Sequence, residues 1–357
     1  MARYLKLHLG LYLGVYRRSA KLKSFIGANT MILARRRLLE LLAGGAALAG
    51  YPRLGMAQSY PARPVRVIVP FAPGGQTDVI ARLVAQRLSD RLGKQFYIEN
   101  AAGGGGNIGA GRAAQAEPDG HSILLVDGIA FAANPALYAT IPYDPIADFE
   151  PVGVAATTMQ VLAVNPSVPA NTVQELVALI KSSPGKFSYA SAGVGTGAHL
   201  TGELFRSSLD LDLVHVPYGG GGPAIAASVA GHTPISFGSP AATIPQVKDG
   251  KLRALVVGGA KRLRALPDVP TIREAGYPQV ECDAWVGVLA PAKTPRDIVA
   301  LLHREIVNVV KIPEVQERLV SLGFEPAETN PQQLADLIRS ELPRWRNVVR
   351  TANIKTN

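Results

Sequence analysis

The sequence predicts an α/β fold of two lobes that face each other across a cleft and are joined by two crossing strands. Its 357 residues exceed what one hydrophobic core normally serves. Strand and helix patterns alternate in two series, which is typical of parallel sheets. Two extended runs, residues 151–166 and 280–290, separate the series. The first run is too long for one ordinary strand, so we interpret both as crossings between lobes.

The first series begins with a β-branched apolar run at Arg66–Phe71, which predicts a buried strand. A helix is expected over Val79–Leu92, where apolar residues recur at helical spacing until Gly93. Further strands are predicted at 96–99 and 122–126, with a helix between them at 107–116.

The second series lies between the two crossings. It predicts helices at 173–182, 197–208 and 223–230, and strands at 187–190, 213–216, 234–237 and 252–257. Three helices are expected after the second crossing, each beginning at a proline: 295–310, 313–322 and 331–352. The predicted organisation is a leader (1–57), a first lobe (58–157), a second lobe (158–280) and a return to the first lobe (281–357).

The first 57 residues have the composition of an export leader. Met31, where we expect translation to start, precedes a basic segment at Arg35–Arg37, an apolar stretch at Leu38–Leu48 and a small-residue site ending at Ala57. The apolar stretch is shorter than the roughly 20 residues of a membrane span. We predict a periplasmic protein, exported by the general secretory route or by the twin-arginine route.

The net charge of +10 is concentrated in this leader. Residues 1–57 hold ten of the 37 basic and one of the 27 acidic residues, which leaves a nearly neutral body. The basic balance is therefore no sign of a nucleic-acid partner. The single cysteine, Cys282, excludes an internal disulfide and is expected in the core.

Four glycine-rich segments stand where a strand gives way to a helix: residues 73–75, 103–106, 190–197 and 219–222. In a parallel sheet such junctions lie at the carboxyl ends of the strands, where ligands bind. Glycine lets the backbone approach a ligand closely, and free N–H groups at a helix start attract anions. The sequence therefore predicts a site for a small anion, held mainly by the backbone.

One of these segments also fits a dinucleotide-binding loop. Gly104, Gly106 and Gly109 have the fingerprint spacing, and Asp127 ends the next strand 18 residues later. However, the loop follows the second strand of its series, and a run of four glycines meets the pattern easily. An exported NAD(P)-dependent oxidoreductase is thus the alternative. Without a zinc motif, a nucleophile elbow or a phosphate loop in the body of the chain, we expect no enzyme, no cofactor and no metal.

Few side chains near the loops offer ionic contacts. Asp78 is either a charge at a helix N-terminus or a partner for a ligand amino group. His199 either donates to an anion or bonds to the nearby backbone, and His215 is expected in the core. Phe71 and Trp285 either line the cleft or belong to the core.

The loops resemble those of the Bug family, the periplasmic receptors of tripartite tricarboxylate transporters. The similarity is carried by three segments: Val69-Pro70-Phe71-Ala72-Pro73-Gly74-Gly75 with Asp78, Tyr189-Ala190-Ser191-Ala192-Gly193 through His199-Leu200, and Val216-Pro217-Tyr218 with Gly220 and Pro223. It extends from Tyr60 to the C-terminal helix. The resemblance implies a type II periplasmic binding protein fold that closes on a small organic acid.

The resemblance also implies which residues bind the ligand, through backbone amides and bridging waters. They are Phe71, Gly74, Gly75, Thr77 and Asp78 in the first lobe and Ser191, Ala192, Gly195, Thr196, His199, Gly220 and Pro223 in the second. Asp127, at a strand end, and Ser239, where the family often carries an acid or amide, complete the candidate set.

The implied partners are a small organic acid and the membrane permease subunits, with the receptor itself expected to be a monomer. Delivery to a signalling partner is the alternative. Gly238 and Ala226–Ser228 replace acidic or amide residues frequent in the family. This departure favours a plain carboxylate or an aromatic acid over an amino acid as the ligand.

Overall fold

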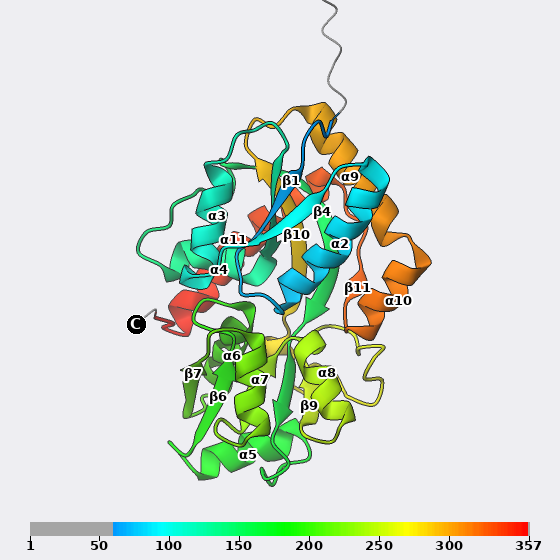
Figure 1. The fold of residues 1–357 in the computed structure, drawn as a ribbon. Helices are drawn as coiled ribbons and strands as arrows, with labels where there is room; N and C mark the ends of the chain where they lie inside the picture. The colour runs from blue at the N-terminus through cyan, green and yellow to red at the C-terminus, as the bar shows by residue number, and fades with distance from the viewer. Residues whose placement is uncertain (1–59, 356–357) are drawn as a thin grey trace, which may run out of the picture. The chain divides into compact units, whose positions relative to one another are not determined.

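The computed structural model describes residues 60–355, which form two sheets, each flanked by helices (Figure 1). The predicted leader and the start at Met31 lie outside these residues. Both sheets belong to one compact unit of the chain. We call each sheet with its helices a lobe. The predicted two-lobed α/β fold class is confirmed.

The sheet of the first lobe has the order β11-β4-β10-β3-β1-β2. Its strands are β1 (Val65–Val69), β2 (Phe96–Asn100), β3 (Ser122–Asp127), β4 (Phe149–Met159), β10 (Asp283–Pro291) and β11 (Glu325–Pro326). β1 pairs in parallel with β2 and β3, whereas β10 runs antiparallel to β3 and β4. The parallel part therefore brings three strand ends to one edge.

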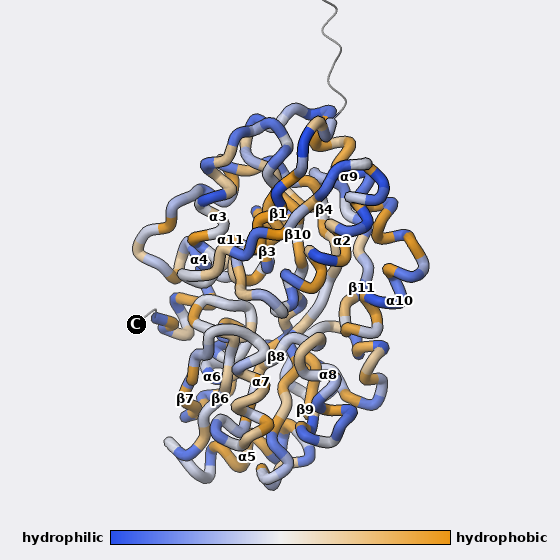
Figure 2. The backbone as a smooth tube through the Cα atoms, viewed as in Figure 1, coloured by the Kyte–Doolittle hydropathy of each residue, from blue (hydrophilic) through white to orange (hydrophobic). Residues whose placement is uncertain are grey.

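Helices cover both faces of this sheet. They are α2 (Gln76–Leu92), α3 (Asn107–Ala114), α4 (Gly128–Leu137), α9 (Arg296–Val310), α10 (Pro313–Ser321) and α11 (Pro331–Thr351). Successive residues of β1 point to opposite faces. Val67 packs with the core under α2 and α9, and Ile68 packs with the core under α3 and α11. Figure 2 shows the hydrophobic residues concentrated along these central strands.

The sheet of the second lobe has the order β7-β6-β8-β5-β9. Its strands are β5 (Val161–Val164), β6 (Phe187–Ser191), β7 (Leu213–Pro217), β8 (Ile235–Gly238) and β9 (Arg253–Val257), and its helices are α5 (Val173–Ser182), α6 (Gly197–Ser208), α7 (Gly221–Val229) and α8 (Pro240–Lys248). β6 pairs in parallel with β7 and β8. This lobe also brings three parallel strand ends to one edge.

The chain first passes from one lobe to the other at Gln160, the single residue between β4 in the first sheet and β5 in the second. The N–H of Gly258 donates to the carbonyl of Gln160 (2.8 Å), and the N–H of Cys282 donates to the carbonyl of Gly258 (2.7 Å). The connecting segments are thus hydrogen-bonded to one another where they pass between the sheets.

Three elements escape the sequence patterns: α4, α8 and β11. Both helices contain an internal proline, Pro135 in α4 and Pro245 in α8, and α4 is apolar nearly throughout. Neither shows the amphipathic period by which helices are recognised. In addition, α2 and α7 begin at Gln76 and Gly221, earlier than predicted. Within residues 60–355, no helix combines the length and apolar character that a membrane span requires.

Candidate functional site

A cavity of about 550 Å³ lies between the two lobes. Its walls come from the segments that follow β1, β2 and β3 in the first lobe and β6, β7 and β8 in the second. Because these are parallel strands, their carboxyl ends collect at the two facing sheet edges. The cavity therefore occupies the place where the topology gathers glycine-rich loops from both lobes.

Eight of the predicted site residues line this cavity: Phe71, Gly75, Thr77, Asp127, Ala192, Thr196, Gly220 and Ser239. Six do not: Gly74, Asp78, Ser191, Gly195, His199 and Pro223. The dinucleotide-like segment Gly104–Gly106 forms a single 3-10 turn and lines the same cavity. The four glycine segments therefore contribute to one common site.

Three helices present uncapped N-termini to the cavity. Gly75, Gly220 and Ser239 stand at the N-cap positions of α2, α7 and α8, and none of them gives the helix a side-chain hydrogen bond. The first N–H groups of a helix have no partner within the helix and carry its positive dipole end. Such termini bind anions, so the cavity suits a carboxylate without any cationic side chain.

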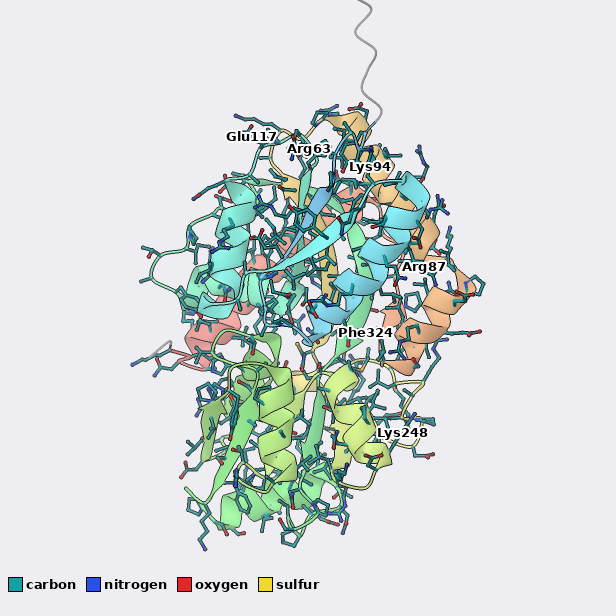
Figure 3. All side chains as sticks on the ribbon, in the orientation of Figure 1. Arg63, Arg87, Lys94, Glu117, Lys248 and Phe324 are labelled. Carbon is teal, nitrogen blue, oxygen red and sulfur yellow. The ribbon has the colours of Figure 1, made fainter. Side chains whose placement is uncertain are left out.

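Charged side chains are placed elsewhere. Among the cavity-lining residues of the described chain, none is Lys, Arg or His, and Asp127 is the only carboxylate. Arg87 of α2 is ion-paired with Glu314 of α10 (3.0 Å), and Lys248 is exposed at the end of α8 (Figure 3). In residues 60–355, no three His, Cys, Asp or Glu side chains gather as a metal site.

Asp127 lies at the wall of the cavity with 5% of its surface exposed. Its Oδ1 accepts a hydrogen bond from the N–H of Ala130 (3.1 Å), which caps α4, and its Oδ2 accepts from Nε2 of Gln76. Burial raises the pKa of this carboxyl, although these hydrogen bonds oppose the shift. Asp127 is thus a buried acid that faces amide donors and no cation.

Three buried oxygens at the cavity wall have no hydrogen-bond partner: Oε1 of Gln76, Oγ1 of Thr77 and Oε1 of Gln160. Buried polar atoms are normally paired, so these groups suggest a missing partner. Sequence reasoning found Thr77 but not the two glutamines. Gln76 directly follows a glycine loop, which was a usable signal, whereas Gln160 lies inside an extended run that gave none.

Asp78 organises the first loop from outside the cavity. Its carboxylate accepts from Nε and Nη2 of Arg82 (2.8 and 2.9 Å), from Nδ2 of Asn100 (2.8 Å) and from the N–H of Gly74 (2.9 Å). Burial would raise the pKa of Asp78, but these bonds outweigh it and lower the pKa. With its lone pairs engaged in this way, Asp78 fixes the loop to the start of α2.

His199 and Ser191 contact the 191–197 loop from the side away from the cavity. Nδ1 of His199 accepts from the N–H of Gly195 (3.2 Å), and Oγ of Ser191 lies 2.6 Å from Nε2 of His215. The two imidazole rings are 4.2 Å apart. Burial lowers the pKa of His199 to about 4 and that of His215 to about 3, so both rings are neutral at neutral pH.

Comparison with known proteins places this site in a family. The profile of the tripartite tricarboxylate transporter family receptor matches residues 80–354. This range covers the second lobe and most of the first, and it begins after β1 and the first glycine-rich loop.

Solved structures of similar sequence have the same fold. The periplasmic binding protein BugD is 35% identical, with a TM-score of 0.79 over 84% of this chain and 100% of its own. An R. palustris protein solved with adipate is 34% identical, with a TM-score of 0.79 over 83% of this chain and 99% of its own. MatC from Rhodopseudomonas palustris with bound malate is 34% identical, with a TM-score of 0.77 over 81% and 100%.

Proposed function

Since this chain belongs to the tripartite tricarboxylate transporter receptor family, also known as Bug proteins, we propose that its cavity captures a small organic carboxylate for a membrane permease. The family consists of periplasmic solute-binding receptors and not of enzymes. The NAD(P)-dependent oxidoreductase alternative is therefore rejected, because the Gly104–Gly106 loop on which it rested lines the receptor cavity.

One observation supports a carboxylate more than any other. The N-termini of α2, α7 and α8 meet at a cavity without a cationic side chain, and none has a side-chain cap. Backbone N–H groups favour an anion without selecting its carbon skeleton. The relatives solved with adipate and with malate carry ligands of this class.

We further propose that the lobes move as the predicted bodies: residues 58–157 with 281–357 against residues 158–280. Gln160 is the natural pivot, because the chain changes sheets there. Binding in the cavity favours the arrangement in which both lobes touch the ligand. The closed receptor, acting as a monomer, then presents its surface to the permease.

Thermal-shift measurements test carboxylate capture. We expect at least one member of a panel of mono- and dicarboxylates to raise the melting temperature in a concentration-dependent manner. Gly221→Pro should lower the affinity for that ligand about tenfold. Proline removes one N–H at the start of α7, but it is tolerated at the first helical position. Arg296→Pro, at the start of α9, is the matched control. A panel without any response contradicts the proposal.

The leader is proposed to direct export to the periplasm. Replacing Arg35 and Arg36 together with lysine decides the route, since the twin-arginine system requires the arginine pair. Loss of the exported product identifies the twin-arginine route, and unchanged export identifies the general secretory route.

A further inference from the structure

We propose that the ligand carries a hydrogen-bond donor, a hydroxyl or an ammonium group, beside its carboxylate, and that Gln76 oriented by Asp127 accepts this donor. The inference rests on the proposed function and narrows it from carboxylates in general to donor-bearing carboxylates. It concerns the part of the cavity wall formed by Gln76, Thr77, Asp127 and Gln160.

The orientation of the Gln76 amide follows from its neighbour. An ionised carboxylate only accepts hydrogen bonds, so the group that Gln76 turns toward Asp127 must be its NH₂. The other oxygen of Asp127 is already engaged by the N–H of Ala130 (3.1 Å). Oε1 of Gln76 is consequently fixed on the side away from Asp127, and it has no partner.

The unpaired groups at this wall are mostly acceptors. Gln76 is 9% exposed and Gln160 is 2% exposed, and the unpaired atom of each is an amide oxygen. Thr77, 1% exposed, adds an unpaired hydroxyl. A buried acceptor without a donor is destabilising. The missing partners of the two amide oxygens must therefore donate hydrogen bonds, whereas the Thr77 hydroxyl can itself donate.

A plain carboxylate cannot fill that role, because both of its oxygens are acceptors. It suits the N-termini of α7 and α8, which lie on other parts of the wall, but it leaves the amide oxygens unpaired. A hydroxyl donates one hydrogen bond, and an ammonium donates up to three and also carries a positive charge toward Asp127. The cavity therefore combines an anion-binding part and a donor-binding part.

This conclusion differs from the sequence-based preference for a plain carboxylate. That preference relied on the missing acids at Gly238 and in helix α7. The structure shows that the cavity does contain a carboxylate, supplied instead by Asp127 at the end of β3.

Matched ligands test the proposal by isothermal titration calorimetry of the purified protein. One series is succinate, malate and aspartate, and another is propionate, lactate and alanine; each differs only in hydrogen, hydroxyl or ammonium at one carbon. We expect a donor-bearing member to bind about tenfold more tightly than its parent, or better. Whichever of the two binds more tightly, the hydroxyl-bearing or the ammonium-bearing ligand, identifies the group that the cavity recognises. Parents that bind as tightly as their donor-bearing partners overturn the inference.

Two variants test whether Gln76 and Asp127 cause the preference for donor-bearing ligands. Asp127→Asn keeps an N-cap for α4 but also offers an NH₂, which lets the Gln76 amide turn around. Gln76→Met removes the acceptor at similar volume. In both variants, the donor-bearing ligand and its parent should bind with nearly equal affinity. The exposed control Asp249→Asn should keep the wild-type ratio of the two affinities. If both variants retain the wild-type ratio, Gln76 is not the acceptor.

Different results would overturn carboxylate capture and the preference for a hydrogen-bond donor. If no carboxylate of either series or of the wider panel binds, the proposed function fails, and this inference fails with it. If carboxylates bind without preference for a donor, the proposed function stands and this inference alone is overturned.

Discussion

The hydroxyl of Tyr138, at the end of α4, lies 3.4 Å from the carbonyl oxygen of Val194 and donates a hydrogen bond to it. This bond joins the first lobe to a cavity loop of the second. Gly105 and Gly195 meet at the same place, since a Cβ built on Gly105 would lie 3.1 Å from the Cα of Gly195. The two lobes therefore touch directly beside the cavity, through a hydroxyl and two glycines.

Tyr138→Phe is expected to weaken ligand binding several-fold while leaving the stability of the unliganded protein nearly unchanged. The variant loses one hydrogen bond that forms only when the lobes are together, about 1 kcal/mol. Calorimetry and melting temperature measure the two quantities. Tyr97→Phe, an exposed position in β2, is the control. Unchanged affinity would show that this contact does not contribute to closure.

Gly105→Ala is expected to reduce ligand affinity at least tenfold. Its φ is +62°, and the added methyl would lie 2.8 Å from the Tyr138 hydroxyl and 3.1 Å from the Val194 carbonyl oxygen. Gly74→Ala is a matched control for backbone strain, because Gly74 has a φ of +80° but nothing within 4 Å of an added methyl. Equal losses of affinity in the two variants would attribute the effect to strain instead of lobe contact.

Asp127→Asn should not lower the melting temperature at pH 7. Burial raises the folded-state pKa of Asp127 above its ordinary 3.8. As the pH rises from 3.8 to that value, the unfolded chain ionises first, so native stability falls and stays lower at neutral pH. Asparagine keeps the helix cap without the buried charge. In melting curves at pH 3, 5 and 7, the melting temperature of the variant should rise relative to that of the wild type as the pH increases. The reverse trend would contradict a raised pKa for Asp127.

Acid should destabilise the protein through His199 and His215. Their folded-state pKa values, about 4 and about 3, lie below the ordinary 6.5. Stability is therefore complete above about pH 6.5 and is lost as the pH falls toward the folded-state values, because the unfolded chain takes up protons first. His199→Asn retains an acceptor for the Gly195 N–H and should flatten the decline of melting temperature between pH 6.5 and 4.

The exposed Ser208, in the same helix as His199, provides the control for that substitution. Ser208→Asn should leave the pH dependence of the melting temperature as in the wild type. An equal effect of the two asparagine variants would contradict the role of the buried histidine pair.

The sequence predicted what depends on periodicity and on glycine, and missed what depends on tertiary contacts. The run from 151 to 166 was recognised as too long for one strand, and the structure divides it at Gln160. Helix α4 was missed because it is buried on nearly all sides and so lacks an amphipathic stripe. The glycine loops gave the location of the cavity through the parallel topology.

The side chains of the site were harder to predict for the same reason. His199 was considered as an anion donor, yet its Nδ1 accepts a hydrogen bond from Gly195 outside the cavity lining. Gln76 acquires its orientation from Asp127, 51 residues later in the chain. No local pattern encodes that pair, because it forms only when β3 and the start of α2 are brought together.

A crystal structure with the tightest-binding carboxylate would test most directly how the cavity holds its ligand. We predict that the carboxylate lies in the cavity, within hydrogen-bonding distance of the first N–H groups of α2, α7 or α8, without contact to any Lys or Arg. A carboxylate bound outside this cavity, or held there by a cationic side chain, would contradict capture by uncapped helix N-termini.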